Sequence, residues 1–127
     1  MKDDRLYLVH VSECLDLIVQ YTQEGEAAFR ADRRTQDAVL RNLHTLTESM
    51  QRISQELKIK YREVDWRGIA AFRNTVVHDY LGIDVPRVWE IIEQDLPMLR
   101  KYVTMMLQEH EGGEGLDGRT RNSAEYP

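Results

Sequence analysis

The sequence predicts an all-α protein, an antiparallel bundle of four to five helices whose C-terminal helix is kinked. Helix-forming residues dominate the 127-residue chain, which has seven Gly and three Pro. Apolar residues recur at steps of three and four, as they do on one face of a helix. The sequence lacks the strict alternation of apolar and polar residues that is typical of a half-buried strand.

Two helices are predicted in the first half of the chain. The first should run from about residue 4 to residue 21, with Asp3 or Asp4 as its cap. The second should start near Asp32 or Thr35 and continue to about residue 57. Its apolar residues alternate steps of four and three, which is typical of helices packed in a bundle. These residues are Val39, Leu43, Leu46, Met50, Ile53 and Leu57.

The second half predicts a third helix over residues 66–78, with Asp65 as its N-cap. Asp84 should cap a fourth helix that has Pro86 in its first turn. Because a proline inside a helix removes one backbone hydrogen bond, Pro97 predicts either one bent helix or two short ones. This organisation predicts a helical domain over residues 1–110.

The remaining residues, 111–127, are rich in Gly, charge and Ser and carry no apolar repeat, so we expect a disordered acidic and polar tail. The single Cys14 lies in an apolar pattern and is expected to be a buried structural thiol. No apolar run approaches the roughly 18 residues of a membrane span, and the N-terminus lacks the apolar core of a signal peptide. We therefore expect a cytoplasmic protein that does not enter membranes.

The net charge of −5 argues weakly against a non-specific polyanion binder, but the balance reverses between residues 58 and 73. That stretch contains two acids and five cations, which are Lys58, Lys60, Arg62, Arg67 and Arg73. The four histidines lie on different predicted elements without a second ligand at metal-binding spacing, and no glycine-rich phosphate loop precedes a helix. We expect neither a metal nor a cofactor.

The segment Arg73-Asn74-Thr75-Val76-Val77-His78-Asp79-Tyr80 carries the candidate chemistry. On a helix, Arg73 lies at the edge of the apolar stripe, whereas Asn74 and His78 are one turn apart. Arg73 and His78 differ by about 140° around an ideal helix. They can meet through the long arginine side chain, through a helix end near His78, or across two subunits.

An imidazole that titrates near neutral pH and a guanidinium fork are sufficient to cleave RNA without a metal. In that chemistry the 2′-hydroxyl attacks its own phosphate, His78 assists proton transfer, and Arg73 stabilises the developing charge. Asn74 would orient one or both of these side chains. The spacing alone proves little, because Arg5 and His10 repeat it in the same chain. The later copy differs from the earlier one in three ways. An asparagine directly follows its arginine, a tyrosine lies two residues after its histidine, and the residues that precede it are mostly apolar.

The stretch from Trp66 to Tyr80, followed by Val88-Trp89-Glu90-Ile91-Ile92 and Asp95-Leu96-Pro97-Met98-Leu99, resembles the HepT branch of the HEPN superfamily. The start of the second helix, Gln36-Asp37-Ala38-Val39, is similar too, so the resemblance runs from about residue 3 to residue 107. It implies a HEPN-like helical-bundle homodimer whose paired Arg-x4-His motifs form a ribonuclease site in the cleft.

The resemblance also implies a toxin of a type VII-like toxin–antitoxin pair that cleaves tRNA or mRNA. Its partner would be an MNT-type nucleotidyltransferase antitoxin, which in that family can transfer AMP to the tyrosine two residues after the histidine. Arg73 and His78 would be catalytic, Asn74 supporting, and Tyr80 modified to O-AMP-tyrosine.

Glu48, Arg67 and Asp79 are further candidate supporting residues, and Glu48 is a candidate ion-pair partner of Arg73 or Arg67. One departure from the family pattern is Thr47-Glu48-Ser49, where the family usually has Gly-Glu-Ala. The larger neighbours put close helix packing at Glu48 in question.

Three structural roles stay open beside the catalytic ones. Tyr80 can close the core at a helix end, Arg73 can form a buried ion pair with Glu48, and His78 can be a helix-terminal histidine. Two other functions also stay open for the whole chain. One is a non-catalytic docking subunit of a nucleotidyltransferase, and the other is an interaction bundle without nucleotide chemistry.

Overall fold

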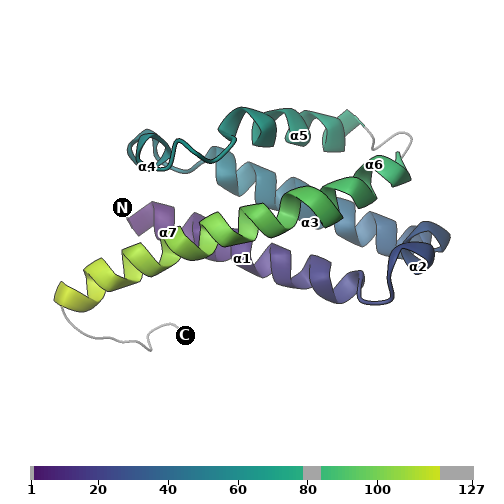
Figure 1. The fold of residues 1–127 in the computed structure, drawn as a ribbon, viewed down its shortest axis with the longest axis horizontal. Coiled ribbons are helices and arrows are strands. Elements are labelled where there is room, and N and C mark those ends of the chain that lie inside the picture. The colour runs from purple at the N-terminus through teal and green to yellow at the C-terminus, as the bar shows by residue number, and fades with distance from the viewer. Residues whose placement is uncertain (1, 79–83, 118–127) are drawn as a thin grey trace.

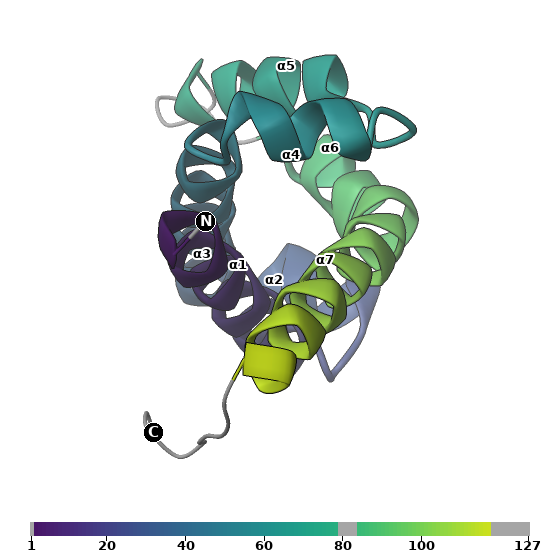
Figure 2. The same ribbon diagram turned by 90° about the vertical axis from the view of Figure 1, so that its left-hand side faces the viewer.

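The computed structural model describes residues 2–78 and 84–117, with side chains described over 3–72 and 84–109. Within these residues the longer helices lie side by side along the molecule (Figure 1) and surround a common interior when seen end-on (Figure 2). This arrangement confirms the predicted all-α bundle. The elements are α1 (Lys2–Tyr21), α2 (Glu26–Ala31), α3 (Arg33–Gln51), α4 (Gln55–Lys60), α5 (Trp66–His78), α6 (Val85–Glu90), the π-helical turn η1 (Ile91–Asp95) and α7 (Leu96–Asp117).

The apolar stripes of α1 and α3 pack against one another and form the base of the core. The stripe predicted for the second helix is buried from Val39 to Ile53. In α1 the burial covers Val11, Leu15 and Ile18, and full burial of such a side chain contributes about 1.5–3 kcal/mol. Tyr21 was expected on the same stripe but is 39% exposed, since it is the last residue of α1.

The short helix α2 was not predicted. Gly25 precedes it with a φ of +94°, a conformation that side-chain-bearing residues rarely adopt. Asp32 then ends α2 and caps α3, as predicted, by accepting a hydrogen bond from the Arg34 amide at 3.0 Å. The Thr35 hydroxyl also donates to Asp32 at 2.9 Å. These two donors, the hydroxyl first, hold the pKa of Asp32 below its ordinary value.

The second predicted helix is interrupted, so its expected continuity to residue 57 is wrong. Helix α3 ends at Gln51, and Ser54 caps a separate helix, α4, by accepting from the Leu57 amide at 3.2 Å. The expected capping by Asp3 or Asp4 is wrong as well, because both lie within α1. Instead, Asp4 is buried and accepts from the Ser54 amide at 2.8 Å and from the Ser54 hydroxyl at 2.6 Å.

The C-terminal helix is kinked, as predicted for one bent helix. Asp84 caps α6 by accepting from the Arg87 amide at 3.1 Å, with Pro86 in the first turn. The helix widens at η1, where the Leu96 amide donates to the Ile91 carbonyl five residues earlier. Pro97 follows directly and has no amide hydrogen, which explains the break in the α-helical ladder at this place. Helix α7 continues to Asp117, past the domain boundary predicted at residue 110.

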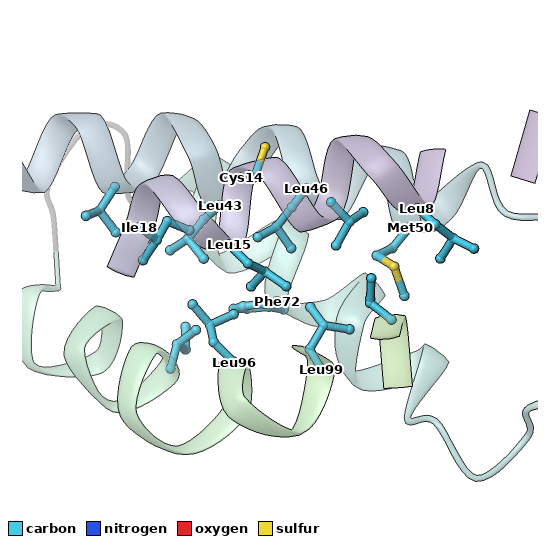
Figure 3. Packing of buried hydrophobic residues seen from close by; sticks show 14 of the residues in the cluster. Leu8, Cys14, Leu15, Ile18, Leu43, Leu46, Met50, Phe72, Leu96 and Leu99 are labelled. Atoms are coloured by element: carbon cyan, nitrogen blue, oxygen red, sulfur yellow. The ribbon is translucent and has the colours of Figure 1, made fainter. Parts of the chain in front are cut away.

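The helices share one apolar core. Figure 3 shows Phe72 of α5 between Leu15 of α1 and the pair Leu96 and Leu99 of α7. Cys14 is 6% exposed, as expected for a structural thiol, and burial raises the pKa of its side chain. Among the described helices, none is both long and apolar enough to cross a bilayer.

Candidate functional site

Helix α5 carries most of the predicted site residues, and its start is fixed by one cap. Asp65 accepts a hydrogen bond from the Gly68 amide at 2.9 Å, which confirms Asp65 as the N-cap. A Cβ atom at position 68 would collide with the Asp65 carboxylate, so the cap in this form requires glycine there. The cap thereby sets where α5 begins and the register of all later positions in it.

Three predicted positions follow one line along α5. Positions 67, 74 and 78 are separated by seven and four residues, so their backbones lie near the same side of the helix. Arg67 is exposed at the start of this line. Arg73, Asn74 and His78 belong to the helical backbone, but their side chains lie outside the described residues, as do Asp79 and Tyr80 entirely. The chemical roles predicted for these five residues therefore remain predictions.

Glu48 lies on α3, which packs beside α5. Its side chain is half-buried, while its neighbours Thr47 and Ser49 are 0% and 8% exposed. Thr47 stands where the family usually has glycine, and its hydroxyl donates to the His44 carbonyl of the same helix at 3.0 Å, so this buried hydroxyl is hydrogen-bonded. The larger residues at 47 and 49 are thus accommodated in the buried surface of α3.

A groove of about 550 Å³ lies along the side of α5 that is opposite the line of positions 67, 74 and 78, and it faces η1 and α7. Its wall on α5 comes from the residues directly before Arg73, and its rim carries three carboxylates and one guanidinium. The sequence did not predict this groove, because it forms only when the π-helical turn is packed opposite the start of α5. It is lined by Glu63, Val64, Asp65, Gly68, Ile69, Phe72, Arg87, Gln94, Asp95, Met98, Leu99 and Tyr102.

The charges of the groove are partly engaged elsewhere. Asp65 holds the cap of α5, and Arg87 pairs with Glu90 at 3.1 Å. In the part of the chain whose side chains are described, no three His, Cys, Asp or Glu residues are grouped as metal ligands would be. His10 and His44 are exposed on α1 and α3, respectively.

The all-α bundle is consistent with the HEPN-like fold that the resemblance of the sequence implied, and α5 carries the Arg-Asn-x3-His segment. The chain belongs to the HepT-like family, because the family model described as "Ribonuclease HepT-like" matches residues 11–106, most of the chain. The matched range includes all of α5 and therefore the complete Arg73-to-His78 segment. Membership supports a ribonuclease.

Several curated proteins are similar to this chain. "Probable ribonuclease HepT" of Thermococcus cleftensis is 34% identical over 95 residues, which cover 74% of this chain and 86% of that protein. "Putative RNase TTE0752" of Caldanaerobacter subterraneus subsp. tengcongensis is 31% identical, with 87% of this chain and 100% of that protein covered.

A longer relative is "Gamma-glutamylcyclotransferase and putative RNase MJ0434" of Methanocaldococcus jannaschii. It is 30% identical over 109 residues, covering 85% of this chain but 49% of that protein. The chain therefore spans about half of this relative. No solved structure matches the chain at a significant level.

Proposed function

We propose that this protein is a metal-independent ribonuclease toxin that cleaves tRNA or mRNA with Arg73 and His78. The observation that carries the proposal is the Arg-Asn-x3-His segment on α5, inside the range that matches the HepT-like family. His78 moves a proton at the attacking 2′-hydroxyl or at the leaving oxygen, and Arg73 stabilises the charge that develops on the phosphate. Asn74 orients these groups.

The site is completed in a homodimer. Positions 73 and 78 are about 140° apart around an ideal helix, which favours a site to which two helices contribute. Two copies of α5 brought together can supply the arginine and the histidine from opposite sides of the scissile phosphate. A symmetric dimer forms two equivalent sites of this kind.

The toxin is silenced when an MNT-type nucleotidyltransferase antitoxin transfers AMP from ATP to Tyr80. The tyrosine oxygen bonds to the α-phosphorus of ATP, pyrophosphate leaves, and the hydroxyl proton is released. Tyr80 lies two residues after His78. The adenylyl phosphate adds negative charge and bulk beside the arginine and histidine, where it competes with the substrate phosphate and repels RNA. Asp79 and Glu48 support the site from α5's end and from α3.

The test compares wild type, His78→Ala and Arg73→Ala on total RNA in EDTA, resolved on a denaturing gel. Because one general acid–base or charge-stabilising group contributes about 10² to 10⁴ in rate, each variant should lose at least about a hundredfold. Circular dichroism checks that all three are equally helical. The exposed His44→Ala serves as the matched control and should cleave like wild type.

A blank wild-type lane requires mass spectrometry of the intact protein before it is interpreted, because a toxin already adenylylated on Tyr80 gives the same result. Unmodified wild type that cleaves no RNA would overturn the proposed activity. Cleavage that persists in His78→Ala would overturn the assigned site while leaving the activity.

One observation favours a second candidate, a docking subunit of a nucleotidyltransferase without its own catalysis. The groove beside α5 combines an apolar wall with an acidic rim, which suits a basic segment of a protein partner. Under this candidate, Arg73 and His78 help to hold the interface with the nucleotidyltransferase, and neither the wild type nor any variant cleaves RNA.

A further inference from the structure

The indole of Trp66, at the start of α5, joins three segments of the chain. Its Nε1 donates a hydrogen bond to the carbonyl of Tyr61 at 3.0 Å. The ammonium of Lys58 lies 5.6 Å from the ring centroid of Trp66, in the range of a cation–π contact. The same ammonium donates to the carbonyl of Gln51, the last residue of α3, at 3.2 Å. The ends of α3 and α4 and the start of α5 therefore meet around one half-buried aromatic ring.

Four cations belong to the segments that meet here, and we refer to them as the Trp66 cluster: Arg52, Lys58, Arg62 and Arg67. Lys58 touches the ring itself, and each arginine is the immediate neighbour in sequence of a residue in the contacts just described. All three arginines are exposed. Lys58, Arg62 and Arg67 belong to the stretch of reversed charge between residues 58 and 73, whereas Arg52 lies before it. Only the fold brings the segments that carry these four cations together around Trp66.

Among the arginines whose side chains are described, Arg52, Arg62 and Arg67 differ from four others in forming no ion pair with a carboxylate, a property that they share with Arg34 and Arg41. Four arginines elsewhere pair with carboxylates: Arg30 with Glu26, Arg33 with Asp37, Arg87 with Glu90, and Arg100 with Asp16. Within the described part of the chain, no carboxylate forms an ion pair with Arg52, Arg62 or Arg67 at 4.0 Å or less. Their charge is thus available to a ligand.

Two acids near the cluster in sequence, Glu63 and Asp65, lie on a different side of α5 from Arg67. Glu63 and Asp65 line the groove on one side of α5, together with Gly68, Ile69 and Phe72. Arg67 is not part of that lining, and its position is about 160° around the helix from that of Ile69. Glu56 is a further exposed acid, on α4. The cluster therefore presents a net positive face in a protein whose total charge is −5.

The line of positions on α5 that begins at Arg67 runs to positions 74 and 78. Eleven residues of α-helix separate its ends, a length of about 16 Å. A strand of RNA can span this distance with a few consecutive nucleotides, placing one phosphate at the predicted catalytic segment and others at the cluster. An exposed series of guanidinium groups that leads to the reacting phosphate suits a polyanionic strand.

We propose that the Trp66 cluster binds the phosphates of single-stranded RNA next to the cleaved bond. The proposal rests on the proposed ribonuclease function, and it assigns Arg52 and Arg62 as RNA-binding residues outside the catalytic segment. Guanidinium groups contact phosphate oxygens through charge-assisted, often bidentate, hydrogen bonds that do not depend on base identity. The cluster therefore contributes affinity and position rather than sequence preference.

The test measures binding of a fluorescein-labelled single-stranded RNA of mixed sequence by fluorescence anisotropy across a salt series. The full chain carries His78→Ala throughout, so that cleavage does not interfere. Arg52→Gln/Arg62→Gln is compared with Arg30→Gln/Arg33→Gln, which removes the same charge at the opposite end of the bundle, where α2 and the start of α3 lie (Figure 1). Circular dichroism and thermal melting verify that both variants fold.

We expect the Arg52/Arg62 variant to bind at least about tenfold more weakly at low salt, with a similar loss for other RNA sequences. The slope of log K against log salt should fall by about 0.7 for each phosphate contact removed. The control variant should keep the affinity and slope of the parent. Equal binding by both variants, equal losses in both, or no RNA binding by the parent would each overturn the proposal.

The two proposals fail separately in this design. If the wild type does not cleave RNA but the His78→Ala parent binds RNA through Arg52 and Arg62, the proposed nuclease is wrong and the RNA-binding cluster is retained. A wild-type protein that cleaves RNA, with binding insensitive to Arg52 and Arg62, would retain the nuclease and remove the cluster.

Discussion

The buried carboxylate of Asp4 shows how one side chain can hold two distant segments together. Asp4 is 3% exposed on α1 and accepts both the amide and the hydroxyl hydrogen of Ser54, fifty residues later. The Ser54 oxygen in turn accepts from the Leu57 amide and caps α4. The start of α4 therefore depends on a residue that belongs to the first turn of α1.

Replacing Asp4 with alanine should lower the free energy of unfolding by about 1–3 kcal/mol, because two donors of Ser54 lose their acceptor. Urea denaturation followed by circular dichroism measures the change. Asp3→Ala is the matched control, since Asp3 is an exposed acid in the same turn, and it should shift the stability by less than about 0.5 kcal/mol. Equal effects of the two substitutions would show that the Ser54 contact is not what stabilises this corner.

Among the helices, α4 is held by contacts at both of its ends. Asp4 of α1 fixes its first turn, and Glu109 of α7 accepts hydrogen bonds from Lys60 and from the Tyr61 hydroxyl at its end. The two donors differ in burial, because Tyr61 is 8% exposed whereas the side chain of Lys60 is 60% exposed. The position of α4 matters for the proposed function, since Lys58 of α4 belongs to the Trp66 cluster and Arg62 follows directly after this segment.

Double-mutant cycles separate the two partners of Glu109. We expect a coupling of about 1–2 kcal/mol between Tyr61→Phe and Glu109→Gln, because a half-buried hydrogen bond to a charged group is lost. The cycle with Lys60→Met and Glu109→Gln should give about 0.5 kcal/mol or less, as is typical of solvent-exposed ion pairs. Chemical denaturation supplies the free energies. A larger coupling for Lys60 than for Tyr61 would contradict this ranking.

On the scale of the whole molecule, the central question is whether one chain contains a complete catalytic site. The helical register keeps positions 73 and 78 apart around α5, which is the reason for proposing a site shared by two chains. Such a site makes a specific prediction for mixtures of inactive variants. One mixed dimer would combine an intact arginine from one subunit with an intact histidine from the other.

Arg73→Ala and His78→Ala proteins, unfolded and refolded together in equal amounts, should recover about a quarter of the wild-type activity. Random pairing gives half mixed dimers, and each mixed dimer regains one of its two sites. Mixing Arg73→Ala with the double variant Arg73→Ala/His78→Ala should recover none. Absence of recovery, with mixed dimers demonstrated by native mass spectrometry of a size-tagged subunit, would place each site within a single chain.

The sequence by itself determined most of the helices, the caps at Asp32, Asp65 and Asp84, and the bend before Pro97. These features depend on neighbours within one or two turns, so periodicity and capping residues are enough to predict them. The stripe from Val39 to Ile53 was predicted correctly for the same reason. The Arg-x4-His segment was also found from the sequence, and the register of α5 follows from its cap.

Tertiary structure alone decided the break between α3 and α4, the groove beside α5, and the assembly of cations around Trp66. The helical pattern continues in the sequence through residue 57, but the chain turns at Arg52 to Ser54, where Asp4 supplies a buried acceptor. Contacts of this kind join residues about fifty positions apart. Their geometry is set by how whole helices pack, which local patterns of residues do not encode.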